Sequence, residues 1–461
     1  MNPKTLQQFK SGLRGEVLDP GNDGYSSARR VWNGLIDRSP ALIVRCTKSS
    51  DVIRAVQFAR SQHLPVAVRS GRHSSPGYSV CDDGIVIDLS QMKDMSVDPV
   101  KAIARTQAGL KLGEFVSRTQ AFGLATTTGT VWGTGLSGLT LGGGMGWLMG
   151  KYGLTIDNLL SVDIVTADGQ VLTASAAENP DLFWGVRGGG GNFGIVTSFE
   201  FRLHPVTTVL AGKVMYPINQ ARDVLRLYRE LTAQACDELT AYASLVTTPD
   251  GTPATEITLC YTGSLDEGER HLQALRKFGA PLRDMIHPKP YLNTVSMLRA
   301  APDGRCYFER SRTLEQLSDE AIDCIVEYGQ ARTSPFSQVL IQHLHGAASR
   351  VHPTGTAFAQ RHESYILGIF AAWTGGEAQK HIEWTRSFWT ATRPFGSLGV
   401  YVNFLGDEGE ERIRASYGLN YQRLVALKNR YDPTNFFHLN QDILPTVKER
   451  GLQNTESILL S

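Results

Sequence analysis

Glycine is distributed very unevenly along this chain, and the distribution limits the folds open to it. The chain has 461 residues and 46 glycines, of which 17 fall in the stretch from Gly129 to Gly194. Glycine costs conformational entropy in regular helices and strands, so this density indicates a region where backbone must come very close to something else. Three clusters stand out: Arg69–Ser74 (RSGRHS), Gly135–Gly146 (GLSGLTLGGGMG) and Arg187–Gly194 (RGGGGNFG).

Two common nucleotide-binding motifs do not account for these clusters. Residues 189–194 (GGGNFG) match GxGxxG in form, but a predicted helix precedes them and a predicted strand follows, the reverse of the dinucleotide-binding order. Lys151 follows Gly150 as in a phosphate-binding loop, but Tyr152 stands in the Ser/Thr position. Tight turns in a β-rich domain remain one interpretation. Because the clusters are set against predicted strands, a long polar ligand such as a pyrophosphate, lying along exposed backbone N–H groups, explains them better.

Composition excludes several other classes of protein. Hydrophobic residues make up 41% and charged residues 20%, which is typical of a globular protein, and the formal net charge is +1. This balance gives no electrostatic reason to expect nucleic acid or an anionic membrane as a partner. The N-terminus lacks an apolar signal core and no run of 18 apolar residues occurs. We therefore expect a cytoplasmic protein without a membrane span, either a monomer or a homodimer.

The cysteines and histidines do not predict a metal site. No two of the six cysteines are closer than 18 residues, so a CxxC spacing does not occur. His343 and His345 alternate on a predicted strand and would share one face, but no third ligand stands near them. No metal is expected.

The first 204 residues are predicted to form a mixed unit of helices, short strands and many turns. The clearest hairpin is 162–174, where alternating apolar residues flank Asp168-Gly169. Apolar periodicity predicts helices over 50–62 and 111–122, and further strands over 66–69, 84–89, 103–107 and 192–203.

After Pro205 glycine becomes less frequent and helices alternate with strands. Helices are predicted over 219–235, 266–278, 315–331 and 377–390, and strands over 211–216, 239–247, 255–263, 337–345 and 365–373. This pattern favours an antiparallel sheet with helices on one face. From Tyr401 the pattern changes again, and one long amphipathic helix is predicted over Glu410–Arg430, stopped by Asp432-Pro433.

Four longer segments carry a family resemblance: Val68–Ser74, Gly138–Asn158, Asp181–Thr197 and Tyr417–Ile443. Taken in order, they resemble the berberine-bridge-enzyme-like branch of the vanillyl-alcohol-oxidase flavoproteins. The resemblance implies an α+β fold with a two-part PCMH-type FAD-binding domain around an antiparallel-sheet substrate domain. The FAD-binding domain would begin at 1–204, the substrate-binding domain would span 205–400, and a C-terminal berberine-bridge-like segment, 401–461, would return to the FAD domain.

The resemblance also implies FAD attached covalently to His73, the histidine of the RSGxH motif. A ring nitrogen bonded to the 8α carbon withdraws electrons and raises the flavin potential, which favours oxidation of poor hydride donors such as alcohols. Further FAD contacts are implied for the glycine clusters and the C-terminal segment, namely Arg69, Ser70, Gly71, Arg72, Ser74, Gly77, Val131, Thr134, Gly135, Gly138, Leu139, Gly142, Gly143, Gly144, Gly146, Asp157, Asn158, Gly191, Gly194, Ile195, Val196, Tyr401, Asn403, Asn440 and Gln441.

Two positions depart from the family pattern. Many relatives attach the flavin a second time through a cysteine, and Val131 stands at that position here, so we expect a single covalent link. Cys81 lies near His73 in sequence but does not occupy the family position. Arg72 replaces a usual glycine, which requires either a negative φ or local strain and brings a cation near the flavin. Thr134, expected beside the reactive edge of the ring, hints at reactivity with oxygen.

Catalytic candidates come from two regions. In the family, a tyrosine of the GxNYxRL motif faces the flavin and takes a substrate proton, which corresponds to Tyr421 first and Tyr417 second; both would share one helical face. An aromatic core stripe is the plainer interpretation of this spacing. His343 is the third candidate, on a strand whose alternation puts Gln342 on the opposite face. Which face looks towards the flavin is left open.

These features predict an FAD-dependent oxidase acting on a small organic substrate. The substrate would be an alcohol, a carbohydrate or a cyclic amine, with dioxygen as acceptor and hydrogen peroxide as product. A flavin-dependent oxygenase that transfers oxygen to a natural product is the alternative. A flavin-binding protein without turnover is a third interpretation, which the candidate bases argue against.

Overall fold

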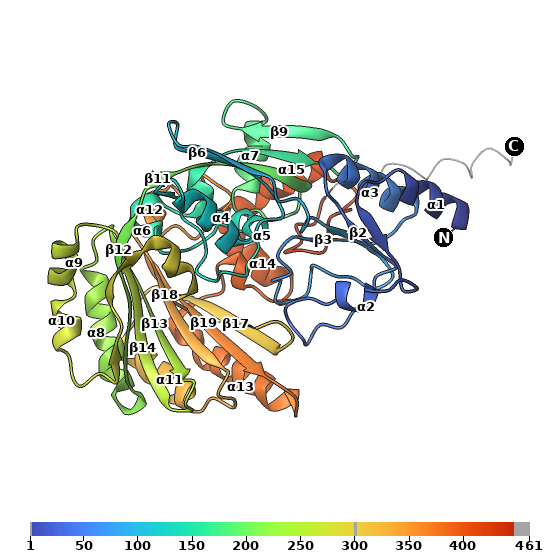
Figure 1. Cartoon of the computed structure of the whole chain (residues 1–461). Coiled ribbons are helices and arrows are strands. Elements are labelled where there is room, and N and C mark those ends of the chain that lie inside the picture. Colours follow the sequence, from blue (N-terminus) through green and yellow to red (C-terminus); the bar gives the residue numbers. More distant parts are fainter. Residues whose placement is uncertain (1, 299–301, 447–461) are drawn as a thin grey trace, which may run out of the picture.

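The computed structural model describes residues 2–298 and 302–446, and three large β-sheets organise them (Figure 1). The first sheet has the strand order β1-β2-β4-β3, with β2, β4 and β3 parallel. Helix α3 provides the crossover that parallel strands need, and its apolar residues belong to the same core as β2 and β4. The elements are α1 (Pro3–Ser11), β1 (Glu16–Leu18), α2 (Tyr25–Ala28), β2 (Leu42–Arg45), α3 (Ser49–Ser61), β3 (Val66–Arg69) and β4 (Ile85–Asp88).

The second sheet is antiparallel, with the order β5-β6-β10-β8-β9. The hairpin predicted around Asp168-Gly169 is confirmed, because β8 pairs with β9 across that turn. The elements are β5 (Met95–Asp98), β6 (Ile103–Gln107), α4 (Leu112–Gln120), β7 (Leu124–Ala125), α5 (Leu136–Leu141), α6 (Met149–Tyr152), the 3₁₀ turn η1 (Thr155–Asn158), β8 (Leu159–Val165), β9 (Val171–Ser175), α7 (Pro180–Val186), β10 (Ile195–Arg202) and β11 (His204–Pro205), which pairs with β7.

The third sheet has nine strands, all paired antiparallel, in the order β15-β12-β14-β13-β18-β19-β17-β20, with β16 also on β12. Its strands are β12 (Thr208–Pro217), β13 (Leu239–Thr247), β14 (Pro253–Tyr261), β15 (Arg283–Asp284), β16 (His287–Pro290), β17 (Cys306–Leu314), β18 (Gln338–Leu344), β19 (Ser364–Trp373) and β20 (Gly396–Ser397). The division of the chain into domains at 204/205 and 400/401 stays a prediction.

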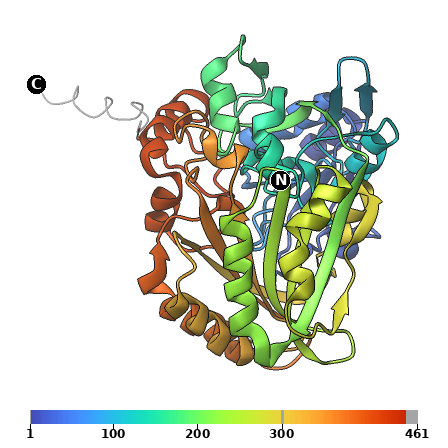
Figure 2. The same cartoon turned by 90° about the vertical axis from the view of Figure 1, so that its left-hand side faces the viewer.

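One face of the nine-stranded sheet is covered by α8 (Ala221–Ala233), α11 (Asp319–Gln330) and α13 (Ala378–Ala391). Their buried apolar residues share a core with alternate residues of β18 and β19, such as Ile341 and Leu367. Figure 2 shows the molecule from the side where α8 lies in Figure 1, with the blue N-terminal part farther away towards the upper right. The predicted α+β class, with helices on one face of an antiparallel sheet, is confirmed. No helix among the described residues is both long and apolar enough to cross a bilayer.

The predicted helix over Glu410–Arg430 is wrong. The segment forms α14 (Glu410–Tyr417), a 3₁₀ turn over Gly418–Asn420, and α15 (Tyr421–Tyr431). Gly418 has a φ of +48°, which a right-handed helix cannot continue through. The Asn420 amide then donates hydrogen bonds to the carbonyls of Pro353 (2.8 Å) and Thr356 (3.1 Å), which fixes the break.

Other differences in the second half are smaller. The helix predicted over 266–278 is divided into α9 (Leu265–His271) and α10 (Gln273–Lys277). The whole of β17 was absent from the predicted strands, although Tyr307, Glu309 and Ser311 alternate with residues of the opposite face along it.

Candidate active site

A cavity of about 470 Å³ lies where three parts of the chain meet, and its size is usual for ligand and cofactor sites. Loops that carry the three glycine clusters line one side. Residues of β17, β18 and β19 line another, on the sheet face that α8, α11 and α13 leave free. Segments 401–405 and 437–441 complete the wall.

Two of the glycine clusters touch each other backbone to backbone. A Cβ added at Gly71 would lie 2.2 Å from the backbone nitrogen of Gly135, and one added at Gly135 would lie 2.5 Å from that of Gly71. Only glycine fits at either position. By contrast, a Cβ at Gly138 or Gly191 would meet nothing within 4 Å, and both residues line the cavity. Their backbone therefore faces open space in which a ligand could lie against it.

His73 stands in this wall as a neutral imidazole. Its ring stacks on Trp32, with centroids 4.7 Å apart, and Trp32 stacks in turn on Tyr307 of β17 at 4.0 Å. Burial lowers the pKa of His73 to about 4, and the nearby Lys111 adds to the effect. A neutral ring keeps a nitrogen lone pair available for bonding at pH 7.

Arg72, beside His73, has a strained backbone. Of the two conformations that its sequence position allowed, a negative φ or local strain, Arg72 has the second. Its φ is +62°, the left-handed region that side chains rarely occupy. Its guanidinium lies 3.2 Å from Asp303 and donates to the Arg30 carbonyl at 3.3 Å. The charge is thus partly compensated at the rim of the cavity.

Most of the residues predicted to contact a cofactor come together around the cavity. Their side chains or backbones line it from the three glycine clusters and from the C-terminal segment. They are Ser70, Gly71, Arg72, His73, Ser74, Val131, Thr134, Gly135, Gly138, Leu139, Gly142, Gly191, Gly194, Ile195, Val196, Tyr401, Asn403, Asn440 and Gln441.

Arg69 and Gly77 do not line the cavity, and their predicted cofactor contacts stay predictions. Strand alternation turns Ser70 to the cavity and Arg69 away from it, where its guanidinium pairs with Asp88 on the neighbouring parallel strand (2.6 Å). Gly77 has a φ of +81° and packs against Ile36. In this structure both residues contact other parts of the protein.

The glycines 143, 144 and 146 also pack against protein instead of lining the cavity. A Cβ at Gly143 would lie 2.8 Å from the Phe358 ring, one at Gly144 2.1 Å from the Thr155 hydroxyl, and one at Gly146 1.6 Å from the Thr128 carbonyl. The second cluster is therefore divided: its first half faces the cavity and its second half is pressed against supporting residues.

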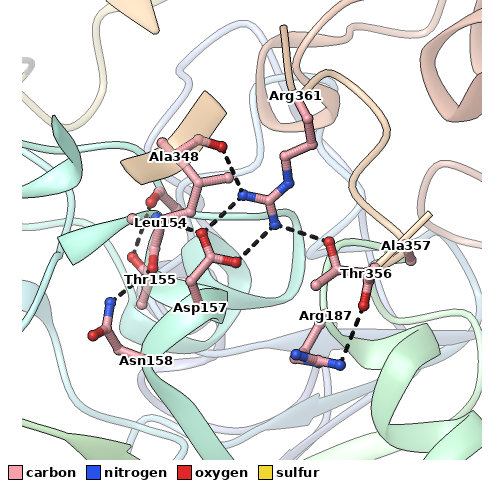
Figure 3. Close-up of polar contacts among 12 residues, drawn as sticks. Leu154, Thr155, Asp157, Asn158, Arg187, Ala348, Thr356, Ala357 and Arg361 are labelled. Carbon is pink, nitrogen blue, oxygen red and sulfur yellow. Dashed lines mark hydrogen bonds and ion pairs between the residues drawn. The ribbon is translucent and has the colours of Figure 1, made fainter. Parts of the chain in front are cut away.

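Asp157 and Asn158 form hydrogen bonds with protein groups next to the second glycine cluster (Figure 3). The Asp157 carboxylate accepts two hydrogen bonds from the buried Arg361 guanidinium, at 2.8 and 2.7 Å, and caps η1 by accepting from the Leu154 N–H. The Asn158 amide donates to the Leu154 carbonyl at 3.0 Å, and its oxygen lies 2.7 Å from a ring nitrogen of His204. Neither lines the cavity, and the predicted cofactor contacts of both stay predictions.

The two candidate tyrosines occupy different surroundings. Tyr417, at the end of α14, lines the cavity, and its buried hydroxyl has no hydrogen-bond partner among the described residues. Tyr421 does not line it, and Arg414 stacks over its ring at 4.5 Å. The break at Gly418 separates the two side chains, and of the two only Tyr417 lines the cavity, which favours Tyr417 over the first-ranked Tyr421; both catalytic roles stay predictions.

The face of β18 that carries Gln342 looks into the cavity. Gln342 lines it, whereas His343 points to the helix-covered face, with its Nε2 3.0 Å from Glu363 and its ring stacked on Tyr365. His343 is therefore corrected as a catalytic candidate. No group of three or more potential metal ligands occurs in the part of the chain that the structure describes.

Tyr401 ties the C-terminal segment to the second glycine cluster. Its hydroxyl accepts hydrogen bonds from the Gly144 N–H (3.0 Å) and from the Asn403 amide (2.7 Å). Asn440 and Gln441 lie on the same wall, and each keeps a side-chain oxygen without a partner among the described residues.

Several lining residues were not among the predicted site residues. They include Trp32, Tyr307, Glu309, Gln338 and Phe370. The period-two alternation in CYFERSRTL could have indicated β17, but nothing in the sequence near Trp32 points to its stacking on His73.

Comparison with known proteins identifies the family. The model for an FAD binding domain matches residues 40–175, and the model described as berberine and berberine like matches residues 400–444. An FAD-linked oxidoreductase of Bacillus subtilis (strain 168) is 33% identical over 446 residues, 95% of this chain and 98% of that protein. The chain belongs to the berberine-bridge-enzyme-like family of FAD-linked oxidoreductases.

Solved structures agree with this. The crystal structure of 6-hydroxy-D-nicotine oxidase from Arthrobacter nicotinovorans has a TM-score of 0.84 and 29% identity, over 94% of this chain and 98% of that one. Glucooligosaccharide oxidase from Acremonium strictum, which carries a 6-S-cysteinyl, 8α-N1-histidyl FAD, shares the fold with a TM-score of 0.85 and 23% identity, over 96% and 99% of the two chains.

The cavity of this FAD-linked oxidoreductase fits an FAD by its own chemistry. The open backbone at Gly138 and Gly191 can follow a long ligand, as the glycine distribution predicted. The partnerless polar groups of Tyr417, Asn440 and Gln441 offer hydrogen bonds within the same wall. Buried polar groups are stabilised by hydrogen-bond partners, which a polar ligand in this cavity could supply to these three groups.

We predict that Gly135→Ala and Gly138→Ala, the same substitution at positions three residues apart, change the stability of the protein in opposite directions. Gly135→Ala forces the two loops apart and should lower the free energy of unfolding by about 1–3 kcal/mol, with loss of bound FAD. Gly138→Ala meets no protein atom and removes a glycine from α5, so it should match or exceed the wild type in stability. Urea unfolding measures both, and equal stabilities would contradict the close contact.

Proposed function

We propose that the protein is an FAD-dependent oxidase that removes hydride from a small organic substrate, passes the electrons to dioxygen and releases hydrogen peroxide. One observation carries the proposal. The same cavity is lined by His73 and the glycine loops on one side and by polar residues of the nine-stranded sheet on another. A cofactor along the loops and a substrate on the sheet would therefore share one cavity.

We further propose that His73 is the sole covalent attachment point. The FAD supplies the hydride-accepting ring, and the neutral imidazole, held by its stack on Trp32, can bond to it through a ring nitrogen. Val131 lines the cavity and has no thiol, and none of the six cysteines, all within the described residues, lines it. Cys81 belongs to a separate apolar core.

Tyr417 is the candidate for taking a substrate proton. Its hydroxyl is buried and has no partner in the described protein, so it is available to a ligand. Burial is the main cause that raises the pKa of Tyr417, with Tyr421 adding to it, so the phenol starts neutral. A neutral phenol can hold the substrate by a hydrogen bond and accept its proton only as hydride leaves.

The substrate class proposed is an alcohol, a carbohydrate or a cyclic amine. The named activities of two similar proteins, a 6-hydroxy-D-nicotine oxidase and a glucooligosaccharide oxidase, support this range. The lining of the cavity, which combines Phe370, Tyr307 and Phe336 with amides of Gln338 and Gln342, suits a small molecule with an apolar body and a few polar groups.

The attachment is tested by acid precipitation. The wild-type pellet should stay yellow, whereas that of His73→Ala should be colourless, with any FAD in the supernatant. Val131→Ala is the control and should keep the colour in the pellet. A colourless wild-type pellet would contradict covalent attachment.

The oxidase reaction is tested by its oxygen stoichiometry. With a substrate found by anaerobic bleaching of the flavin, the protein should release one hydrogen peroxide for each dioxygen consumed. Labelled oxygen should stay out of the organic product. Label recovered in the product would instead identify an oxygenase.

Tyr417→Phe should slow flavin reduction by substrate by about 10²- to 10⁴-fold, the usual contribution of a positioned acid or base. Tyr421→Phe is the same change outside the cavity. In this variant the substrate should reduce the flavin at close to the wild-type rate. Anaerobic stopped-flow measurements compare the two. Equal effects would argue that both act only through packing.

A further inference from the structure

A buried carboxyl group faces the cavity from the nine-stranded sheet. Glu309 lies in the middle of β17, and its side chain points into the cavity together with that of Tyr307, two residues earlier. In the cross-strand register Glu309 lies opposite Phe370 of β19, which lies opposite Gln338 of β18. All three line the cavity, and Glu309 is the only acidic residue among the described residues that do so.

Within the described part of the chain, the Glu309 carboxyl has no cation at ion-pairing distance. The Ser75 hydroxyl, from the loop after β3, lies close enough to lower the pKa of this carboxyl. The neighbouring Arg310 is engaged with Glu408, at 3.5 Å. Burial raises the pKa of Glu309 to about 7, with Glu408 adding to the rise and Ser75 and Arg310 opposing it. A carboxyl held half ionised at neutral pH is suited to gaining a partner.

The other titratable groups that line the cavity do not supply that partner. Arg72 is paired with Asp303, and the Arg305 guanidinium lies 3.8 Å from the centre of the Phe336 ring. Burial keeps His73 neutral by lowering its pKa to about 4. Burial likewise raises the pKa of Tyr78 to about 12, so this phenol is neutral as well. The negative charge at Glu309 is therefore left for a ligand to compensate.

Building on the oxidase function proposed above, we propose that Glu309 binds the cationic nitrogen of the substrate, so that the preferred substrate is an aliphatic amine that is protonated in solution. An ammonium group placed on the row formed by Gln338, Phe370 and Glu309 would compensate the buried carboxylate and lie beside an aromatic face. A sugar or a simple alcohol carries no cation, so it cannot offset the free-energy cost of burying the Glu309 carboxylate.

Glu309 also gives the substrate a route to its reactive form. The ammonium donates an N–H hydrogen bond to a carboxylate oxygen, and the proton then moves from nitrogen to that oxygen. The products of this step are a neutral amine and a neutral carboxyl group, so charge is conserved and none remains in the site. The neutral amine has the nitrogen lone pair that assists loss of hydride from the adjacent C–H bond.

Paired ligands test this assignment on the FAD-loaded protein. The probes are aryl-substituted cyclic amines and the cyclic ethers of the same shape, with binding followed by the perturbation of the flavin spectrum. The wild type should bind each amine more tightly than its ether. Glu309→Gln, which keeps the shape and removes the charge, should weaken amine binding by about 10- to 100-fold and leave ether binding unchanged.

The pH dependence gives a second readout. For an amine that stays protonated, wild-type affinity should rise from pH 6 to 8 as Glu309 ionises, and Glu309→Gln should lack this rise. Ser75→Ala removes the hydroxyl that lowers the pKa of Glu309, so the rise should move to higher pH. Glu363→Gln is the matched control, since this glutamate is exposed and pairs with His343 on the other face of the sheet. It should behave as the wild type does.

The outcomes separate this assignment from the oxidase function. Equal amine-to-ether preference in the wild type and in Glu309→Gln would overturn the role of Glu309, even if the protein proves to be an oxidase of sugars or alcohols. A charge-dependent amine preference without peroxide release would uphold Glu309 and overturn the oxidase. Because removing a buried charge relieves its desolvation cost, Glu309→Gln should melt no lower than the wild type, which excludes misfolding as the cause.

Discussion

The backbone contact between Gly71 and Gly135 is the constraint on which the cavity depends. It joins a loop that follows the parallel sheet to a loop that precedes α5, with no side chain between them. The carbonyl of Ala108 fixes the same junction, since it accepts hydrogen bonds from the hydroxyls of both Ser70 and Ser137. Any side chain at the contact would separate the loops and move His73 away from the wall that it helps to form.

Two further ties connect this junction to the rest of the molecule. The stack of His73, Trp32 and Tyr307 joins the first loop to β17, and the hydroxyl of Tyr401 joins the second cluster to the C-terminal segment. The pair of Asp157 and Arg361 holds η1, whose backbone N–H groups bond to carbonyls of the second cluster (Figure 3). The site is therefore assembled from segments far apart in sequence, and each segment is fixed by a different kind of interaction.

The sequence predicted the elements better than the contacts between them, and the reason is physical. Periodicity is local, so α3, β3, β13 and the hairpin of β8 and β9 follow from it. The partners of Arg69 and Asp157 lie 19 and 204 residues away, and no local pattern distinguishes a charge paired across the fold from one that holds a ligand. The break at Gly418 was missed because the apolar stripe continues through it, although the backbone does not.

The buried ion pairs of this protein provide a comparison for Glu309. Arg69 is paired with Asp88, Arg361 with Asp157, and Lys428 with Asp432 at 2.8 Å, where both side chains are fully buried. These pairs are held within the protein because an unpaired buried charge costs several kcal/mol. No ion pair is found for the Glu309 carboxyl among the described residues, and this carboxyl lies on the wall of the cavity that the glycine loops also line. A carboxyl without an ion pair on the wall of a ligand cavity supports the proposal that the ligand supplies its partner.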